Sequence, residues 1–155
     1  MKAKVRTAIK SDIPLIVKMG AKFYEESNFE KGGFDGKRFT EILEFMHECG
    51  EHITLIAEVK GQAIGFIIFD VSRHYTKYLI SCMYLFYVDK DNRKHNAGAE
   101  LIKAAKIVAR QKGAKYFYGS SSAGFEDEGK NERALIGIYE RQGFKDNGVF
   151  MRVEL

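Results

Sequence analysis

Residues 78–88 restrict the fold of this chain more than any other segment, because apolar and aromatic side chains alternate onto both faces of an extended backbone there. One face would carry Leu79, Met83 and Leu85, and the other Ile80, Cys82, Tyr84, Phe86 and Val88. A strand that is apolar on both faces must be covered on both sides, as happens in sheets flanked by helices. The pattern therefore predicts a central strand in a layered α/β structure.

Periodic patterns on either side of this strand predict the helices and partner strands of such a structure. Helical spacing indicates one helix that starts after Ser11 or Asp12 and a second that Gly50 ends. Two more helices are predicted over residues 96–112 and 131–142, and further strands over residues 4–9, 53–59, 63–71, 115–118 and 149–153. This order of elements predicts a mixed α/β sheet.

Length and composition limit the class of protein. A chain of 155 residues, 45% of them hydrophobic and 30% charged, fits one globular domain covering residues 1–155. The two cysteines, Cys49 and Cys82, and the four histidines lack metal-ligand spacing, so no metal is predicted. No apolar run approaches the ~20 residues of a membrane span, and no secretory signal precedes the first strand, so we expect a cytoplasmic protein with no membrane partner.

The formal net charge of +4 admits two kinds of ligand. A basic nucleic-acid-binding module is one alternative, and it predicts steeply salt-dependent binding. The charges are interspersed along the chain and no basic patch is interleaved with aromatic residues, which counts against nucleic acid. An acidic small ligand accounts for the excess charge equally well.

Residues 88–101 are the candidate for that ligand, because a strand ends there, a polar turn follows and a helix begins. The first turn of a helix has unpaired backbone N–H groups and the positive end of the helix dipole. The small residues Ala97, Gly98 and Ala99 would let an anion approach, and Arg93 and Lys94 add positive charge. These residues predict a pyrophosphate-binding turn, although an ordinary turn with small residues for close packing has the same pattern.

The run Arg93-Lys94-His95-Asn96-Ala97-Gly98 resembles the signature Gln/Arg-x-x-Gly-x-Gly/Ala of the GNAT superfamily of N-acetyltransferases, with Asn96 in place of the first glycine. Tyr139, followed by Gly143 and Phe144, is similar to the Tyr-x-x-x-Gly-Phe that ends a late helix of that family. The order of elements resembles the family over essentially the whole chain. The resemblance implies the acyl-CoA N-acyltransferase fold, a mixed, mostly antiparallel sheet with helices on both faces.

The resemblance also implies an activity. An acetyl group would pass from acetyl-CoA to a primary amine, on a small molecule or a protein, by direct attack in a ternary complex. Backbone groups of Phe86, Tyr87 and Val88 would pair with pantetheine, Tyr139 would act as the general acid toward the leaving thiolate, and Asn131 would touch the cofactor. The turn that would hold the pyrophosphate consists of Arg93, Lys94, His95, Asn96, Ala97, Gly98 and Ala99.

Several functional features stay open at this stage. Family members that use a glutamate as general base would place it near residues 118–120, and this chain has none there. Glu126, Asp127 and Glu128, or a chain of water molecules to a more distant base, are the alternatives. Phe29 and Phe34 suggest an aromatic lid over the acceptor. A non-catalytic CoA-binding or structural protein on the same fold is the alternative function. The family resemblance also allows a homodimer.

Overall fold

A computed structural model of the protein describes residues 2–27, 33–120 and 130–146. The strands are β1 (Lys4–Thr7), β2 (His52–Val59), β3 (Gln62–Asp70), β4 (Ile80–Val88) and β5 (Tyr116–Tyr118). The α-helices are α1 (Ile13–Glu26), α2 (Gly36–Cys49), α3 (Ala97–Gln111) and α4 (Lys130–Arg141), and two short 3-10 helices are η1 (Lys10–Asp12) and η2 (Lys90–His95). The strand predicted over residues 149–153 lies outside the described residues. Within the described ranges, no helix combines the length and the apolar character that crossing a bilayer requires.

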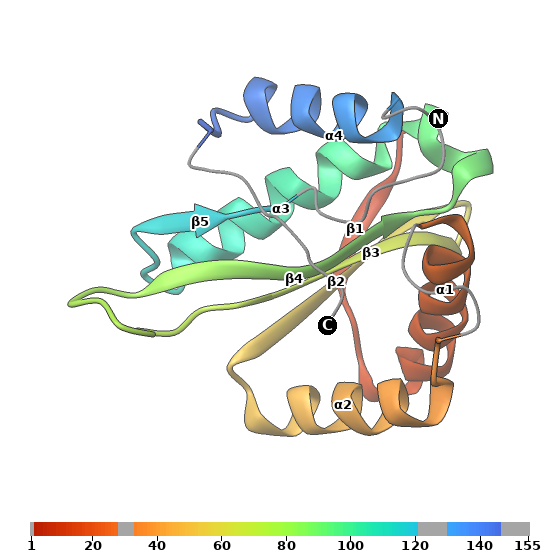
Figure 1. Ribbon diagram of the computed structural model, residues 1–155, viewed down its shortest axis with the longest axis horizontal. Coiled ribbons are helices and arrows are strands. Elements are labelled where there is room, and N and C mark those ends of the chain that lie inside the picture. Colours follow the sequence, from red (N-terminus) through yellow and green to blue (C-terminus); the bar gives the residue numbers. More distant parts are fainter. Residues whose placement is uncertain (1, 28–32, 121–129, 147–155) are drawn as a thin grey trace, which may run out of the picture.

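The strands form an open five-stranded sheet in the order β1-β2-β3-β4-β5. The first three pairings are antiparallel, and β4 and β5 are parallel. Helices α1 and α2 lie on one side of the sheet, and α3 and α4 lie on the other (Figure 1). This confirms the predicted mixed, mostly antiparallel sheet with helices on both faces.

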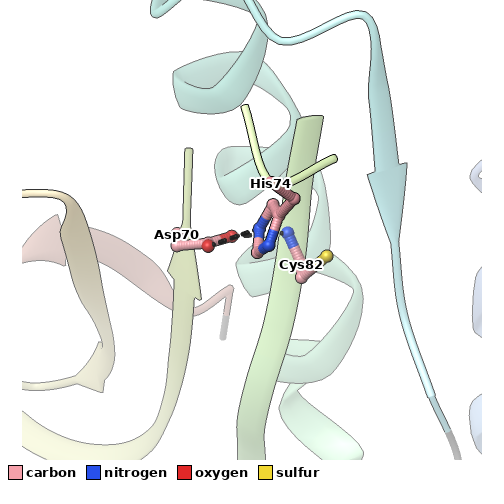
Figure 2. Close-up of side chains that lie close together, drawn as sticks. All are labelled: Asp70, His74 and Cys82. Carbon is pink, nitrogen blue, oxygen red and sulfur yellow. Dashed lines mark hydrogen bonds and ion pairs between the residues drawn. The ribbon is translucent and has the colours of Figure 1, made fainter. Parts of the chain in front are cut away.

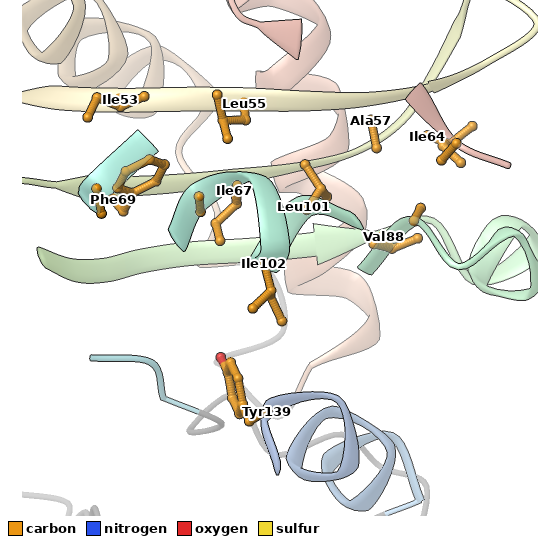
Figure 3. Close-up of a cluster of buried hydrophobic side chains, with 14 residues drawn as sticks. Ile53, Leu55, Ala57, Ile64, Ile67, Phe69, Val88, Leu101, Ile102 and Tyr139 are labelled. Carbon is orange, nitrogen blue, oxygen red and sulfur yellow. The ribbon is translucent and has the colours of Figure 1, made fainter. Parts of the chain in front are cut away.

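Two separate hydrophobic cores follow from this layering. The core under α3 and α4 includes Leu101 and Ile102 of α3 and Ile67 of β3 (Figure 3). The core under α1 and α2 includes Ile16, Phe66 and Tyr87. Strand β4 contributes Val88 to the first core and Tyr87 to the second, so both of its faces are covered at its C-terminal end, as its sequence predicts.

Asp12 shows how the start of α1 is fixed. Although it precedes the helix, its carboxylate makes no capping bond to the first turn of α1. It accepts instead from Arg6 of β1 through two hydrogen bonds, of 2.7 and 2.9 Å, and from the backbone N–H of Ile9. The Arg6 guanidinium is the main cause that lowers the pKa of Asp12 below its ordinary value.

This ion pair predicts a pH-dependent stability. Because the pKa of Asp12 is lower in the folded chain than in the unfolded chain, its contribution is complete above about pH 5 and is lost as the pH falls through the folded pKa. We expect Arg6→Leu to flatten the fall of the unfolding free energy between about pH 5 and pH 2. Urea unfolding at each pH measures this slope, and Arg38→Leu, which removes an exposed arginine of α2, is the control. Equal acid slopes for wild type and Arg6→Leu would contradict the prediction.

Candidate active site

Strands β4 and β5 separate soon after they begin. They pair only from Ile80 with Tyr116 to Cys82 with Tyr118, whereas β4 continues to Val88. The register with β3 skips Tyr84, which makes it the extra residue of a β-bulge. A bulge bends its strand and increases the local twist. Beyond Cys82, the edge of β4 that faces β5 therefore has no strand partner among the described residues.

The alternation of hydrogen bonds tells which backbone groups face this open edge. The N–H of Asp89 donates to the C=O of Ile64 across the β3 side, at 2.9 Å. In an antiparallel ladder every second residue bonds to the same neighbour, so Tyr87 also directs its backbone groups to β3. Phe86 and Val88 direct theirs to the open edge. Of the three predicted residues, these two direct backbone groups to the open edge, where the C=O of Val88 accepts from Nε of Arg93.

The turn after β4 leads directly into the N-terminus of α3. Asn96, at the position of the family's first glycine, has the left-handed φ of 59° that asparagine tolerates better than most residues. The first bond of α3 runs from the N–H of Glu100 to the C=O of Asn96. The N–H groups of Ala97, Gly98 and Ala99 precede it, and helices leave such groups without intrahelical partners.

The small residues of this turn also serve close packing. Ala97 is fully buried, and a Cβ on Gly98 would lie 3.2 Å from Cζ of Phe86 and 3.4 Å from Cδ1 of Ile138. The Cα atom of Gly98 therefore faces the core between α3, β4 and α4. Close packing therefore explains the small side chains of this turn, whereas the predicted pyrophosphate would meet its backbone N–H groups.

Arg93 joins this turn to α1. Its Nη2 atom lies 2.6 Å from Oε2 of Glu26, and its Nε donates to the C=O of Val88 at 3.1 Å. Glu26 also accepts the hydroxyl of Tyr87 at 2.6 Å, and burial raises the pKa of that tyrosine. Lys94 is exposed beside them. Nothing local in the sequence indicated Glu26, which lies 67 residues before Arg93.

Tyr139 places its hydroxyl where β4 and β5 diverge. The hydroxyl donates to the C=O of Ser120, just after β5, at 3.0 Å, and lies 3.5 Å from Sδ of Met83 on β4. Figure 3 shows the ring rising from α4 toward the sheet. The residue is only 8% exposed, and burial raises the pKa of its phenol. A Cβ on Gly119 would lie 2.9 Å from this ring, so the close approach requires glycine there.

Other predicted residues are only partly described. Asn131 lies in the first turn of α4, but its side chain is outside the described residues, as are Phe29, Glu126, Asp127 and Glu128. The ring of Phe34 packs against Tyr24 and Phe39, with centroids 5.2 and 5.8 Å away. Phe34 thus helps to join α1 and α2.

Comparison with solved structures finds the same fold in other proteins. AAC(6')-Iy in complex with a bisubstrate analogue, CoA-S-monomethyl-acetylneamine, superposes with a TM-score of 0.76 at 15% identity over 100% of both chains. An aminoglycoside acetyltransferase from an uncultured soil metagenomic sample gives 0.72 at 16% identity, over 99% of this chain and 96% of that one. Glucosamine-6-phosphate N-acetyltransferase from Arabidopsis thaliana gives 0.71 at 14% identity, over 99% of both chains.

Sequence comparison identifies the family. No curated protein sequence matches the chain significantly. The acetyltransferase (GNAT) domain family matches residues 50–146, which is more than half of the chain and includes the open edge of β4, the turn before α3 and Tyr139. The chain therefore belongs to the GNAT family of acetyltransferases.

Proposed function

We propose that the protein is an N-acetyltransferase that uses acetyl-CoA to acetylate a primary amine of a small molecule or protein, by direct attack in a ternary complex. The observation that carries the proposal is the open edge of β4, which runs from the hydroxyl of Tyr139 to the N-terminus of α3. An extended ligand with an anionic group at one end and a reactive group at the other fits such an edge.

The backbone groups of Phe86 and Val88 would bind the pantetheine arm in the manner of a strand. The N–H groups of Ala97, Gly98 and Ala99 would bind the pyrophosphate, because they lie at the positive end of the α3 dipole. Residues around them complete the turn: Arg93, Lys94, His95 and Asn96. Tyr87 contributes indirectly, since its hydroxyl and Arg93 share Glu26. Asn131 is proposed as a further contact.

Acetyl-CoA would supply an acyl group already activated as a thioester. Tyr139 would supply the proton for the leaving sulfur, because burial raises the pKa of its phenol and keeps it protonated at neutral pH. Its hydrogen bond to the C=O of Ser120 holds the hydroxyl between the two strands. An N–H group of the open edge near Val88 would donate to the thioester oxygen as negative charge develops there.

An amine acceptor is supported by the similar structures. One is an aminoglycoside acetyltransferase, and another is in complex with the bisubstrate analogue CoA-S-monomethyl-acetylneamine. A third is a glucosamine-6-phosphate N-acetyltransferase. All of these acceptors carry amino groups on sugar rings. Amino sugars and aminoglycosides are therefore the first compounds to test as acceptors.

Calorimetry with acetyl-CoA tests the proposed binding site. We expect the wild type to bind, and Ala99→Glu to bind at least about tenfold more weakly, because its carboxylate would repel the pyrophosphate. A glutamate at the third position of a helix favours folding, so the variant should remain stable.

Ala99→Gln is the matched control, since it has the same shape without the charge, and its affinity should stay within about threefold of the wild type. Absence of wild-type binding at saturating acetyl-CoA would contradict the proposal and leave the turn before α3 a packing feature. An equal loss in both variants would mean that bulk, and not charge, is excluded there.

A further inference from the structure

A buried carboxylate lies at the end of β3, on the side of the sheet away from Tyr139. Asp70 has a side chain only 4% exposed, and four donors surround it. Figure 2 shows two of these contacts, those with His74 and with the N–H of Cys82. Oδ1 accepts the N–H of Cys82 at 2.8 Å, and Oδ2 lies 2.7 Å from Nε2 of His74. The hydroxyls of Tyr84 and Ser72 donate to Oδ2 at 3.1 and 3.2 Å. These contacts use both oxygens of the carboxylate.

His74 turns back onto this carboxylate from the connection between β3 and β4. Its backbone has a left-handed φ of 44°, and the next turn is closed by the N–H of Thr76 bonding to the C=O of Arg73. The imidazole is 28% exposed and uses Nε2 for Asp70. No described residue bonds to its Nδ1. The ring therefore has one nitrogen oriented by a carboxylate and one available to a ligand, as a histidine general base requires.

The Asp70–His74 pair and Tyr139 contact neighbouring residues of β4. Cys82, whose N–H bonds to Asp70, is the last residue of β4 that pairs with β5. The next residue, Met83, contacts the hydroxyl of Tyr139. Phe69 packs in the same core as Tyr139, and successive strand residues point to opposite faces, so Asp70 points to the other face. A proton acceptor and a proton donor thus lie on opposite sides of the point where the strands diverge.

Other titratable groups surround the pair from neighbouring elements. His52 of β2 lies directly across from Asp70, and its ring lies 5.3 Å from that of Tyr84. Glu51 lies beside His52, and Cys49 at the end of α2 contacts the His52 ring at 3.3 Å. Burial, followed by the charge of Asp70, raises the pKa of Tyr84 to about 12, so its hydroxyl remains a donor.

A metal ion is the other ligand that this cluster could attract. Ligand atoms of Asp70, His74 and Cys82 lie within 4.8 Å of one another. However, both carboxylate oxygens already accept from protein donors, and burial and Asp70 raise the pKa of the Cys82 thiol. A thiol must lose its proton to bind zinc. The contacts therefore favour a proton-accepting histidine over a metal site.

We propose that His74, oriented by Asp70, is the general base that accepts a proton from the ammonium group of the acceptor. This inference rests on the proposed acetyl transfer. Nδ1 of His74 takes one proton from nitrogen, the neutral amine forms the C–N bond, and the C–S bond breaks. Sulfur receives the proton of Tyr139, and the phenolate takes the second proton that nitrogen loses. His74 returns its proton to water, so the net products are the amide, CoA thiol and one proton.

Nitrogen NMR of the histidine rings tests the pair without any substrate. We expect neutral His74 to carry its proton on Nε2, which faces Asp70, and to leave Nδ1 without one. His74→Ala assigns the resonances, and Asp70→Leu should let the two tautomers mix. An Nδ1–H tautomer of His74 in the wild type would overturn the proposal.

Kinetics then test the catalytic role, with the amine that the wild type acetylates fastest in a panel of amino sugars, aminoglycosides and polyamines. His74→Ala should lower kcat/KM by about 100-fold at pH 7, keep its acetyl-CoA affinity within about twofold, and be partly rescued by added imidazole. His47→Ala should retain full activity.

The outcomes separate this inference from the proposed function. Normal acetyl-CoA binding together with normal turnover and pH profile in His74→Ala would overturn the general base alone. Loss of wild-type activity with a chelator and its recovery with zinc would overturn it in favour of a metal site. A wild type that does not bind acetyl-CoA would contradict the proposed function itself, and the general base with it.

Discussion

Replacing Tyr139 with Phe is expected to lower kcat by about 100- to 1,000-fold while the Kd of acetyl-CoA changes by less than about twofold. The hydroxyl is the only group removed, and it lies between Met83 and the C=O of Ser120 where β4 and β5 diverge. A thiolate that leaves without a proton donor must instead take its proton from water. Single-turnover kinetics with the best amine acceptor measure the effect on the chemical step.

The fold should tolerate this change. The ring of Tyr139 packs against Phe144 with centroids 4.9 Å apart, and phenylalanine keeps that contact. The lost hydrogen bond to Ser120 costs about 1 kcal/mol of unfolding free energy. Tyr116→Phe, an exposed tyrosine of β5, is the matched control and should keep full activity. A stable Tyr139→Phe protein with wild-type kcat would show that another group protonates the sulfur.

Replacing Glu26 with Ala is expected to destabilise the protein by about 2–3 kcal/mol and to weaken acetyl-CoA binding by about tenfold. Its carboxylate is the acceptor for both the Tyr87 hydroxyl and the Arg93 guanidinium. Without it, a hydroxyl in the core under α1 loses its partner, and Arg93 loses the ion pair that holds it beside the C=O of Val88. Urea unfolding and calorimetry measure the two effects.

Two further variants identify the cause of these losses. Glu25→Ala changes the neighbouring, exposed glutamate of α1 and should leave both stability and affinity near wild type. Adding Tyr87→Phe to Glu26→Ala should recover part of the stability, because the unpaired hydroxyl is then absent, but should not recover acetyl-CoA binding. If Glu26→Ala behaves like Glu25→Ala, the ion pair with Arg93 does not support the turn before α3.

Much of the fold could be predicted from local patterns. The helical spacing that ends in Phe23 predicts the buried stripe of α1, and Gly50 ends α2 with the left-handed φ that glycine adopts freely. The family motifs predicted where the turn before α3 and Tyr139 occur in the chain. The predicted roles of these residues follow from the resemblance, and the Ala99, Tyr139 and Glu26 variants are their tests.

Periodicity and short motifs thus determined the order of the elements, the layering around β4 and the position of the signature turn, because each of these depends on residues only a few positions apart. Tertiary structure alone decided the bulge at Tyr84, the short pairing of β4 with β5, and the contacts of Glu26 with Arg93 and of Asp70 with Cys82. These features depend on strand register and on how layers far apart in sequence pack together. A pattern of neighbouring residues reports which face is buried, but it carries no information on which distant side chain meets it there.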